Sequence, residues 1–135
     1  MSESDADVRA LVAGHADFAA GLVSAVGQIT GRAEAFVTLS NRDMSAQDVE
    51  RAMREQVDRR ALEVIFTDLP AGSCTMAARR LQRERPAVVV VTGTNLATLL
   101  DFVFHTDVPA GEAAQHAAEK GRASLVVTGG APGGH

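Results

Sequence analysis

Short apolar stretches alternate with amphipathic segments along the whole chain. The apolar stretches are rich in Val, Leu, Ile, Phe and Ala, and they predict buried strands at 8–13, 35–39, 61–66, 87–91 and 123–127. Between them, apolar residues recur at helical spacing, which predicts helices over 18–29, 45–57, 75–83, 96–104 and 110–120. The stretch at 87–91 is continuous and β-branched, so we expect it to be buried on both faces.

Polar and glycine residues mark the ends of the predicted helices. N-caps are expected at Asp17, Ser45, Ser73 and Asn95. Ser45 is followed by Asp48 three positions later, which is a variant of the capping box. Gly31 and Gly121 are expected to stop the helices that precede them.

The alternation of strands and helices predicts an α/β fold. We expect a flavodoxin-like open parallel sheet in the order 2-1-3-4, with helices on both faces. The last strand, at 123–127, would lie at an edge of the sheet and is able to run antiparallel. Because an uncovered edge strand is prone to pairing, we also expect a dimer. Residues 1–135 are interpreted as one domain with an ordered core over about 8–127.

Composition and charge narrow the function. The chain has 135 residues, 46% hydrophobic residues and a net charge of −4, which argues against nucleic acid as a partner. The acidic N-terminus and the lack of a long apolar run predict a cytoplasmic protein without membrane insertion. A single cysteine, Cys74, excludes an internal disulfide and is expected to be a small buried residue.

The candidate chemistry lies where the winding of the predicted sheet reverses. Ligands in open α/β sheets bind beyond the carboxyl ends of the strands at this point, which places His15 beside Asp68. A carboxylate that accepts from Nδ1–H would leave Nε2 as a nucleophile, and such a bond contributes about 1.5–3 kcal/mol. Gly72 and Ser73 open a helix whose free N–H groups suit an anion such as a phosphoryl group.

Several other polar residues have simpler interpretations. His105 and His116 lie at or near helix ends without ligand-like spacing, so we expect them at the surface. No metal or organic cofactor is implied. Asp17, Asp43 and Asp101 are either helix-start acids or an acidic ring that attracts a basic partner.

Three motifs in order carry a resemblance to a known family. They are AGHA at 13–16, FTDLPAGS at 66–73 and VTGTNL at 91–96. On these motifs, the chain resembles the enzyme IIA component of the mannose/fructose/sorbose family. The resemblance extends over about residues 8–127. This family belongs to the bacterial phosphoenolpyruvate-dependent sugar phosphotransferase system.

The resemblance implies a phosphohistidine carrier. His15 would accept a phosphoryl group on Nε2 from the phosphocarrier protein HPr and pass it to a IIB component of the permease. Asp68 would hold His15, while Ser73, Gly72 and Gly14 would bind the phosphoryl oxygens. Asn95 would support the site as a helix cap. The family folds as a flavodoxin-like domain and dimerises by exchanging its last strand.

The chain departs from the family pattern beside these residues. Gly14 and Ala16 stand where the family usually has Thr and Gly, and Ala71 stands where it usually has Gly. Ala71 is therefore expected to have a negative φ. Two alternatives stay open. The first is a phosphorylation-sensitive regulatory binding module, and the second is the phosphoryl-donor subunit of a dihydroxyacetone kinase.

Overall fold

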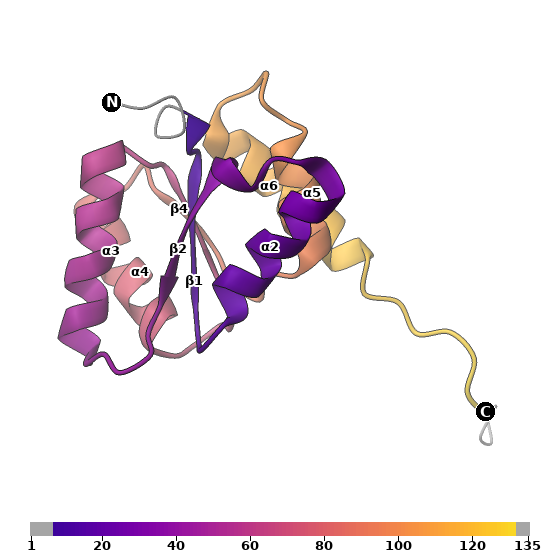
Figure 1. The fold of residues 1–135 in the computed structure, drawn as a ribbon, viewed down its shortest axis with the longest axis horizontal. Coiled ribbons are helices and arrows are strands. Elements are labelled where there is room, and N and C mark those ends of the chain that lie inside the picture. The colour runs from indigo at the N-terminus through magenta and orange to yellow at the C-terminus, as the bar shows by residue number, and fades with distance from the viewer. Residues whose placement is uncertain (1–6, 132–135) are drawn as a thin grey trace.

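Strands and helices alternate through most of the structure, a computed structural model that describes residues 7–131 (Figure 1). In chain order the elements are β1 (Ala10–Gly14), α2 (Phe18–Thr30), η1 (Ala33–Ala35), β2 (Phe36–Ser40), α3 (Ala46–Arg60), β3 (Val64–Thr67), α4 (Ser73–Glu84), β4 (Val89–Val91), α5 (Leu96–Val103) and α6 (Ala110–Ala123). Across the described residues, every helix falls short of the length and apolarity that a membrane crossing requires.

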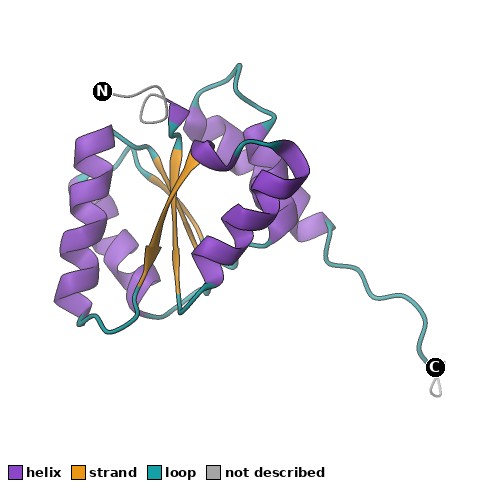
Figure 2. Ribbon diagram, viewed as in Figure 1, coloured by secondary structure: helices purple, strands orange, loops and turns teal. Residues whose placement is uncertain are grey.

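The strands form one parallel sheet in the order β2-β1-β3-β4, which confirms the predicted topology. Figure 2 shows α3 and α4 against one face of the sheet and α2, α5 and α6 against the other. Because each strand is followed by a loop at the same edge, this order brings the loops after β1 and β3 together at the centre of the sheet.

Alternate strand residues supply two separate cores. Val12 and Phe66 pack towards α2, α5 and α6, whereas Leu11 and Ile65 pack towards α3 and α4. The first core contains an aromatic cluster of Phe36, Phe66 and Phe102, in which Phe66 and Phe102 meet edge to face with their centroids 5.1 Å apart. Burial on both faces holds the central strands, and therefore the loops at their ends, in fixed positions.

Helix α6 corrects the prediction that Gly121 ends the last helix. Gly121 lies inside α6 and is buried against α5, where an added Cβ would overlap the Thr98 hydroxyl. The Gly121 carbonyl also accepts a hydrogen bond of 2.9 Å from the Asn95 amide. Glycine is needed here for close approach of two helices, so the tertiary contact overrides the local stop signal.

The predicted last strand, 123–127, is also corrected. Ala123 belongs to α6, and residues 124–131 form no strand in the described chain. This segment leaves the body of the molecule beyond α6 (Figure 1), and its apolar side chains Leu125 and Val127 are exposed. The longer helix carries the chain away from the sheet, so a single subunit does not place this segment on an edge.

Two further expectations are changed by tertiary context. The residues of β4 are half-buried rather than buried on both faces, because β4 is an edge strand within the described sheet. Gly72, not Ser73, occupies the N-cap of α4, and Ser73 is its first residue. The capping box of Ser45 and Asp48 is confirmed, and so is the end of α2 at Gly31, which has a left-handed conformation.

Candidate functional site

Parallel pairing of β1 with β3 places His15 next to Asp68. Ala13 pairs with Thr67 in the sheet, so Gly14 and His15 on one strand emerge beside Asp68 on the other at the carboxyl ends of the strands. The predicted neighbourhood of His15 and Asp68 is therefore confirmed, and it follows from the sheet order rather than from proximity in the sequence.

One carboxylate oxygen holds His15 at two points. Asp68 Oδ2 lies 2.7 Å from His15 Nδ1 and accepts the His15 backbone N–H at 2.8 Å. The side chain of Asp68 is 9% exposed and that of His15 is 52% exposed. Because Nδ1–H donates to the carboxylate, the lone pair of the neutral ring is on Nε2, the other ring nitrogen. The pair therefore presents an exposed imidazole that is held at Nδ1 and has a free lone pair on Nε2.

The local environment keeps Asp68 ionised. Burial raises the pKa of Asp68, but the hydrogen bonds that it accepts from the His15 side chain and backbone, together with the electrostatic attraction of the His15 ring, lower the pKa below its ordinary value overall. An ionised Asp68 stabilises positive charge on the imidazole ring. This is the electrostatic requirement of a histidine that bonds an electrophile at its other nitrogen.

The loop after β3 is anchored by buried threonines. The Thr75 hydroxyl donates to the Leu69 carbonyl at 2.5 Å and lies 2.7 Å from the Thr67 hydroxyl. Gly72 has φ 111° and ψ 170°, a conformation that essentially only glycine adopts, and an added Cβ would lie 3.3 Å from His15 Cε1. Gly72 thus allows the loop to lie against the imidazole ring.

The N-terminus of α4 supplies donors beside this loop. Ser73 begins the helix, and its first N–H groups have no intrahelical acceptor. Asn41 Nδ2 donates to the Ser73 hydroxyl at 2.8 Å, which fixes the position of that oxygen. Ala71 is not among the residues with positive φ, so the expectation of a negative φ is confirmed.

Sequence reasoning missed Asn41 and Thr75 as residues that shape the site. Asn41 directly follows β2, and its backbone N–H donates to the Gly14 carbonyl at 3.2 Å. The rule that ligands bind at the carboxyl ends of the strands would have singled out Asn41. The role of Thr75 depends on a buried contact across the loop, for which the sequence has no local signal.

The remaining candidates lie around the site in different roles. Asn95 caps α5 by accepting from the Thr98 N–H at 3.0 Å, and its amide binds α6, so its contacts join these helices. Cys74 is buried as predicted, and burial followed by the charge of Asp68 raises the pKa of its thiol to about 11. Cys74 is therefore unsuited to be a nucleophile at neutral pH.

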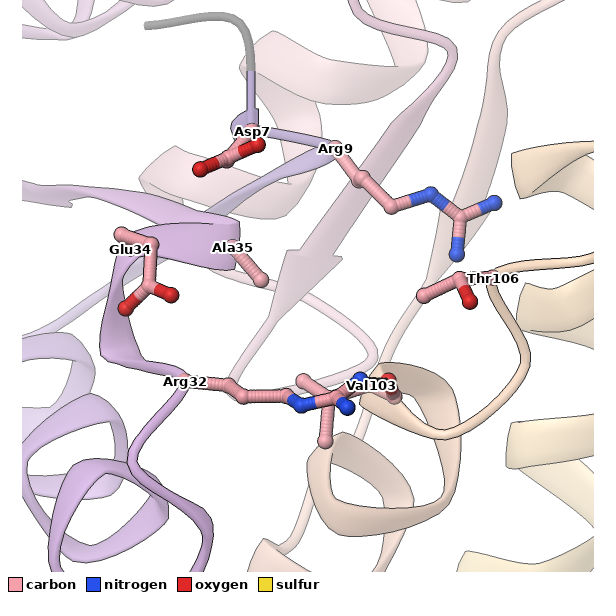
Figure 3. A pocket seen from close by; sticks show the side chains of 7 residues that line it. All are labelled: Asp7, Arg9, Arg32, Glu34, Ala35, Val103 and Thr106. Atoms are coloured by element: carbon pink, nitrogen blue, oxygen red, sulfur yellow. Dashed lines mark hydrogen bonds between the residues drawn. The ribbon is translucent and has the colours of Figure 1, made fainter. Parts of the chain in front are cut away.

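A cavity of about 430 Å³ lies at the other end of the sheet (Figure 3). Its lining includes Arg9 and Arg32 as well as the acidic residues Asp7 and Glu34. The guanidinium groups donate to backbone carbonyls, Arg9 to His105 at 2.8 Å and Arg32 to Val103 at 3.0 Å. Arg32 ties the segment before β2 to the end of α5, and Arg9 ties the segment before β1 to the loop after α5, so both arginines have structural roles here.

Replacing Gly14 by alanine is expected to disturb both the fold and the site. An added Cβ would lie 2.6 Å from Phe18 Cδ2 and 2.9 Å from the carboxyl carbon of Asp68. We expect Gly14→Ala to lower the free energy of unfolding by about 1–3 kcal/mol, as overpacking does. Chemical denaturation measures this. Gly21→Ala is the control, because an added Cβ there meets open space in α2.

Ala16 is a residue at which a glycine should stabilise the protein. Its φ is 47°, in the left-handed region, and the turn around it is closed by the Phe18 N–H donating to the His15 carbonyl. The strain on alanine exceeds the entropic cost of glycine, so Ala16→Gly should raise the unfolding free energy by roughly 0.5–1 kcal/mol. Ala20→Gly, on the exposed face of α2, should lower it instead. Equal destabilisation of both variants in thermal or denaturant unfolding would contradict this account.

Comparison with known proteins agrees with this fold. The family model described as "PTS system fructose IIA component" matches residues 9–119. Comparison with curated proteins finds no match to the chain.

Solved structures share the architecture at low sequence identity. A phosphotransferase system component EIIA from Streptococcus agalactiae superposes with a TM-score of 0.79 at 21% identity, covering 89% of this chain and 96% of that chain. The mannose/sorbose-specific IIA subunit from Enterococcus faecalis superposes with a TM-score of 0.74 at 19% identity, covering 90% of this chain and 95% of that chain. A PTS IIA protein associated with the fucose utilization operon of Streptococcus pneumoniae superposes with a TM-score of 0.74 at 23% identity, covering 88% of this chain and 91% of that chain.

The family match spans residues 9–119, which include both strands that carry the His15–Asp68 pair. The chain therefore belongs to the fructose IIA component family of the sugar phosphotransferase system.

Proposed function

We propose that this protein carries a phosphoryl group on Nε2 of His15 in a phosphoenolpyruvate-dependent sugar phosphotransferase system. The observation that carries the proposal is the imidazole held through Nδ1 by Asp68, with more than half of its surface exposed at the carboxyl edge of the sheet. The donor would be the phosphohistidine of HPr and the acceptor a histidine of a IIB component. This function places the protein in the cytoplasm.

The transfer needs no proton to leave His15. The Nε2 lone pair attacks phosphorus, the Nε2–P bond forms, and the P–N bond of the donor breaks as its imidazole departs with the electron pair. Nδ1–H stays bonded to Asp68, which stabilises the positive charge that the ring gains. Exchange between two imidazoles is nearly balanced in energy, so the protein contributes mainly alignment of the reacting groups.

The segment from Gly72 to Ser73 would hold the phosphoryl oxygens. The backbone N–H groups at the start of α4 and the Ser73 hydroxyl, which Asn41 positions, are the donors for this anion. Gly72 keeps a side chain away from the ring, because an added Cβ would lie 3.3 Å from His15 Cε1. Gly14 leaves room for the Asp68 carboxylate, whose carbon an added Cβ would approach to 2.9 Å. Asn95 supports the loop after β4 from a greater distance.

Phosphorylation with purified components tests the function. The full-length protein is incubated with phosphoenolpyruvate, enzyme I and HPr, and then with the IIB protein of the same gene cluster. We expect one acid-labile, base-stable phosphate, located on His15 by mass spectrometry, and its transfer to IIB. Failure of HPr to phosphorylate the protein would overturn the proposal.

The same assay separates the two alternative functions. A regulatory binding module would take up phosphate from HPr but would not pass it to any IIB protein. A phosphoryl-donor subunit of a dihydroxyacetone kinase would pass it instead to a nucleotide held on a partner subunit. Either result would replace IIB transfer as the role of phosphorylated His15.

We also propose that two copies of the chain pair through the segment 124–127. In the described chain β4 has β3 as its sheet neighbour and is half-buried, so its other edge is open to a strand. The apolar side chains from Leu125 to Val127 are 67–93% exposed, which is costly for a free segment and suits burial against a second subunit. If two subunits exchanged this segment, it would pair with the open edge of β4 and its apolar side chains would become buried.

Charges placed in this segment are expected to convert the dimer to a monomer. The double variant Leu125→Asp, Val127→Asp removes the apolar surface and sets like charges on the pairing segment. Sedimentation velocity should show one species of half the wild-type mass. Ala131→Asp, beyond the segment, is the control and should stay dimeric. A monomeric wild-type protein at all accessible concentrations would contradict the proposed pairing.

A further inference from the structure

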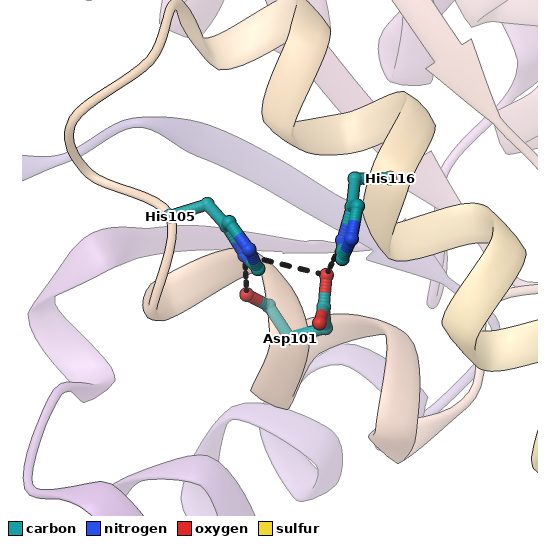
Figure 4. A group of neighbouring side chains, drawn as sticks. All are labelled: Asp101, His105 and His116. Carbon is teal, nitrogen blue, oxygen red and sulfur yellow. Dashed lines mark hydrogen bonds and ion pairs between the residues drawn. The ribbon is translucent and has the colours of Figure 1, made fainter.

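A compact group of metal-ligating side chains lies far from the proposed phosphorylation site. Asp101 lies in the last turn of α5, His105 follows just beyond the helix, and His116 reaches them from α6 (Figure 4). One ligand atom from each residue lies within 4.8 Å of the other two. Asp101 Oδ2 is 2.7 Å from His116 Nδ1 and 3.4 Å from His105 Nδ1. The sequence pattern predicts both histidines as unrelated surface residues, and the packing of α5 against α6 brings them together.

The donor set and its dimensions match a small divalent transition-metal ion. Two imidazoles with one carboxylate are common ligands of Zn²⁺ sites that keep an open position. With metal–ligand bonds of about 2.0–2.1 Å in a tetrahedron, neighbouring ligand atoms lie about 3.3 Å apart. The distance of 3.4 Å from Asp101 Oδ2 to His105 Nδ1 is close to this edge. The 2.7 Å contact with His116 Nδ1 is a hydrogen bond, and His105 Nδ1 also lies 2.9 Å from the Asp101 carbonyl oxygen, so the ion would replace these two hydrogen bonds.

The surroundings hold the ligands in place while leaving one side open. The carboxylate of Asp101 is 14% exposed, whereas the imidazoles of His105 and His116 are 34% and 49% exposed. Helices α5 and α6 are fixed to one another by the buried Gly121 and its hydrogen bond from Asn95. Arg9 donates to the His105 carbonyl and fixes the backbone beyond α5.

We propose that Asp101, His105 and His116 form a binding site for a divalent transition-metal ion of the Zn²⁺ type, with its fourth position open to solvent. The site would join the end of α5 to α6. It lies at the opposite edge of the sheet from His15, because Arg9, which contacts His105, precedes β1 and His15 follows β1. The metal site is therefore separate in space from the proposed phosphorylation site.

Metal titration of the untagged, metal-free, full-length protein tests the site. We expect one equivalent of Zn²⁺ to bind in isothermal titration calorimetry and Co²⁺ to give the intense visible bands of a tetrahedral complex. His105→Ala and His116→Ala should each weaken Zn²⁺ binding by more than roughly 10-fold, since losing even an outer hydrogen-bond partner costs 10–100-fold. Zn²⁺ should also raise the melting temperature of wild type but not of His116→Ala.

Control variants separate this site from the other histidines. His15→Gln and His135→Ala remove histidines outside the cluster and should keep one equivalent of bound Zn²⁺ at wild-type affinity. Circular dichroism checks that the variants fold. Equal Zn²⁺ affinity of wild type and the His105→Ala, His116→Ala double variant would overturn the proposal, as would loss of binding in His15→Gln alone.

Discussion

A protein in which His15 is replaced by glutamine is expected to take up no phosphoryl group from HPr. Glutamine is similar in length and carries a polar side chain, but its amide nitrogen has no available lone pair and cannot attack phosphorus. The rest of the proposed site, including Asp68 and the start of α4, stays in place. Labelled phosphoenolpyruvate with enzyme I and HPr measures the incorporation, which should fall to background.

His116→Gln is the matched control for this experiment. The two imidazoles are similarly exposed, at 52% and 49%, and each has an aspartate on Nδ1. Exposure and a carboxylate partner are therefore equal, and the difference is the position at the carboxyl edge of the sheet. We expect normal phosphorylation of His116→Gln. If phosphate incorporation persisted in His15→Gln and disappeared in His116→Gln, the phosphorylated residue would be His116. That result would contradict the proposal.

Removing the charge of Asp68 is expected to slow phosphoryl transfer by roughly 10- to 100-fold. A hydrogen bond to a charged group contributes about 1.5–3 kcal/mol, and each 1.36 kcal/mol is about a factor of ten in rate. Asparagine can still accept one hydrogen bond through its carbonyl oxygen, but it does not stabilise the positive ring that forms as Nε2 bonds phosphorus. Rapid-quench kinetics with phosphorylated HPr measures the rate for Asp68→Asn.

Asp17→Asn controls for the loss of one negative charge near the site. Asp17 precedes α2, is highly exposed, and pairs with Arg42 at 3.1 Å rather than with the histidine. Its removal should leave the transfer rate within about twofold of wild type, because an exposed ion pair contributes little. If Asp17→Asn and Asp68→Asn slowed transfer equally, the general field of the surface, and not the contact with His15, would be responsible.

The sequence predicted the frame of this fold because its strands and most helix ends have local signals. Alternating apolar stretches and amphipathic segments were sufficient for the sheet order, and the Ser45 capping box was correctly located. The prediction errors occur where contacts between distant segments determine the local structure. Gly121 has the local signature of a helix end, yet the contact with Thr98 makes it an interior residue of α6.

The residues of the candidate site also fall into two groups, those that the sequence predicts and those that only the folded geometry reveals. His15 and Asp68 were placed together by sheet order alone, because a parallel sheet brings the ends of its strands to one edge. Asn41 and Thr75 act through hydrogen bonds to other loops, which depend on the folded geometry. The grouping of His116 with Asp101 depends on how α5 and α6 face each other, and a scan for spacing within one helix cannot find it.

The aromatic cluster of Phe36, Phe66 and Phe102 gives the protein an intrinsic spectroscopic reporter. The chain has no tryptophan or tyrosine and five phenylalanines, so its near-ultraviolet circular dichroism comes from phenylalanine alone. Three of these rings touch one another in the core shared by β2, β3 and α5. Loss of the phenylalanine bands from the near-ultraviolet spectrum during heating would therefore report disrupted packing on one side of the sheet. The far-ultraviolet signal would report the unfolding of all the helices.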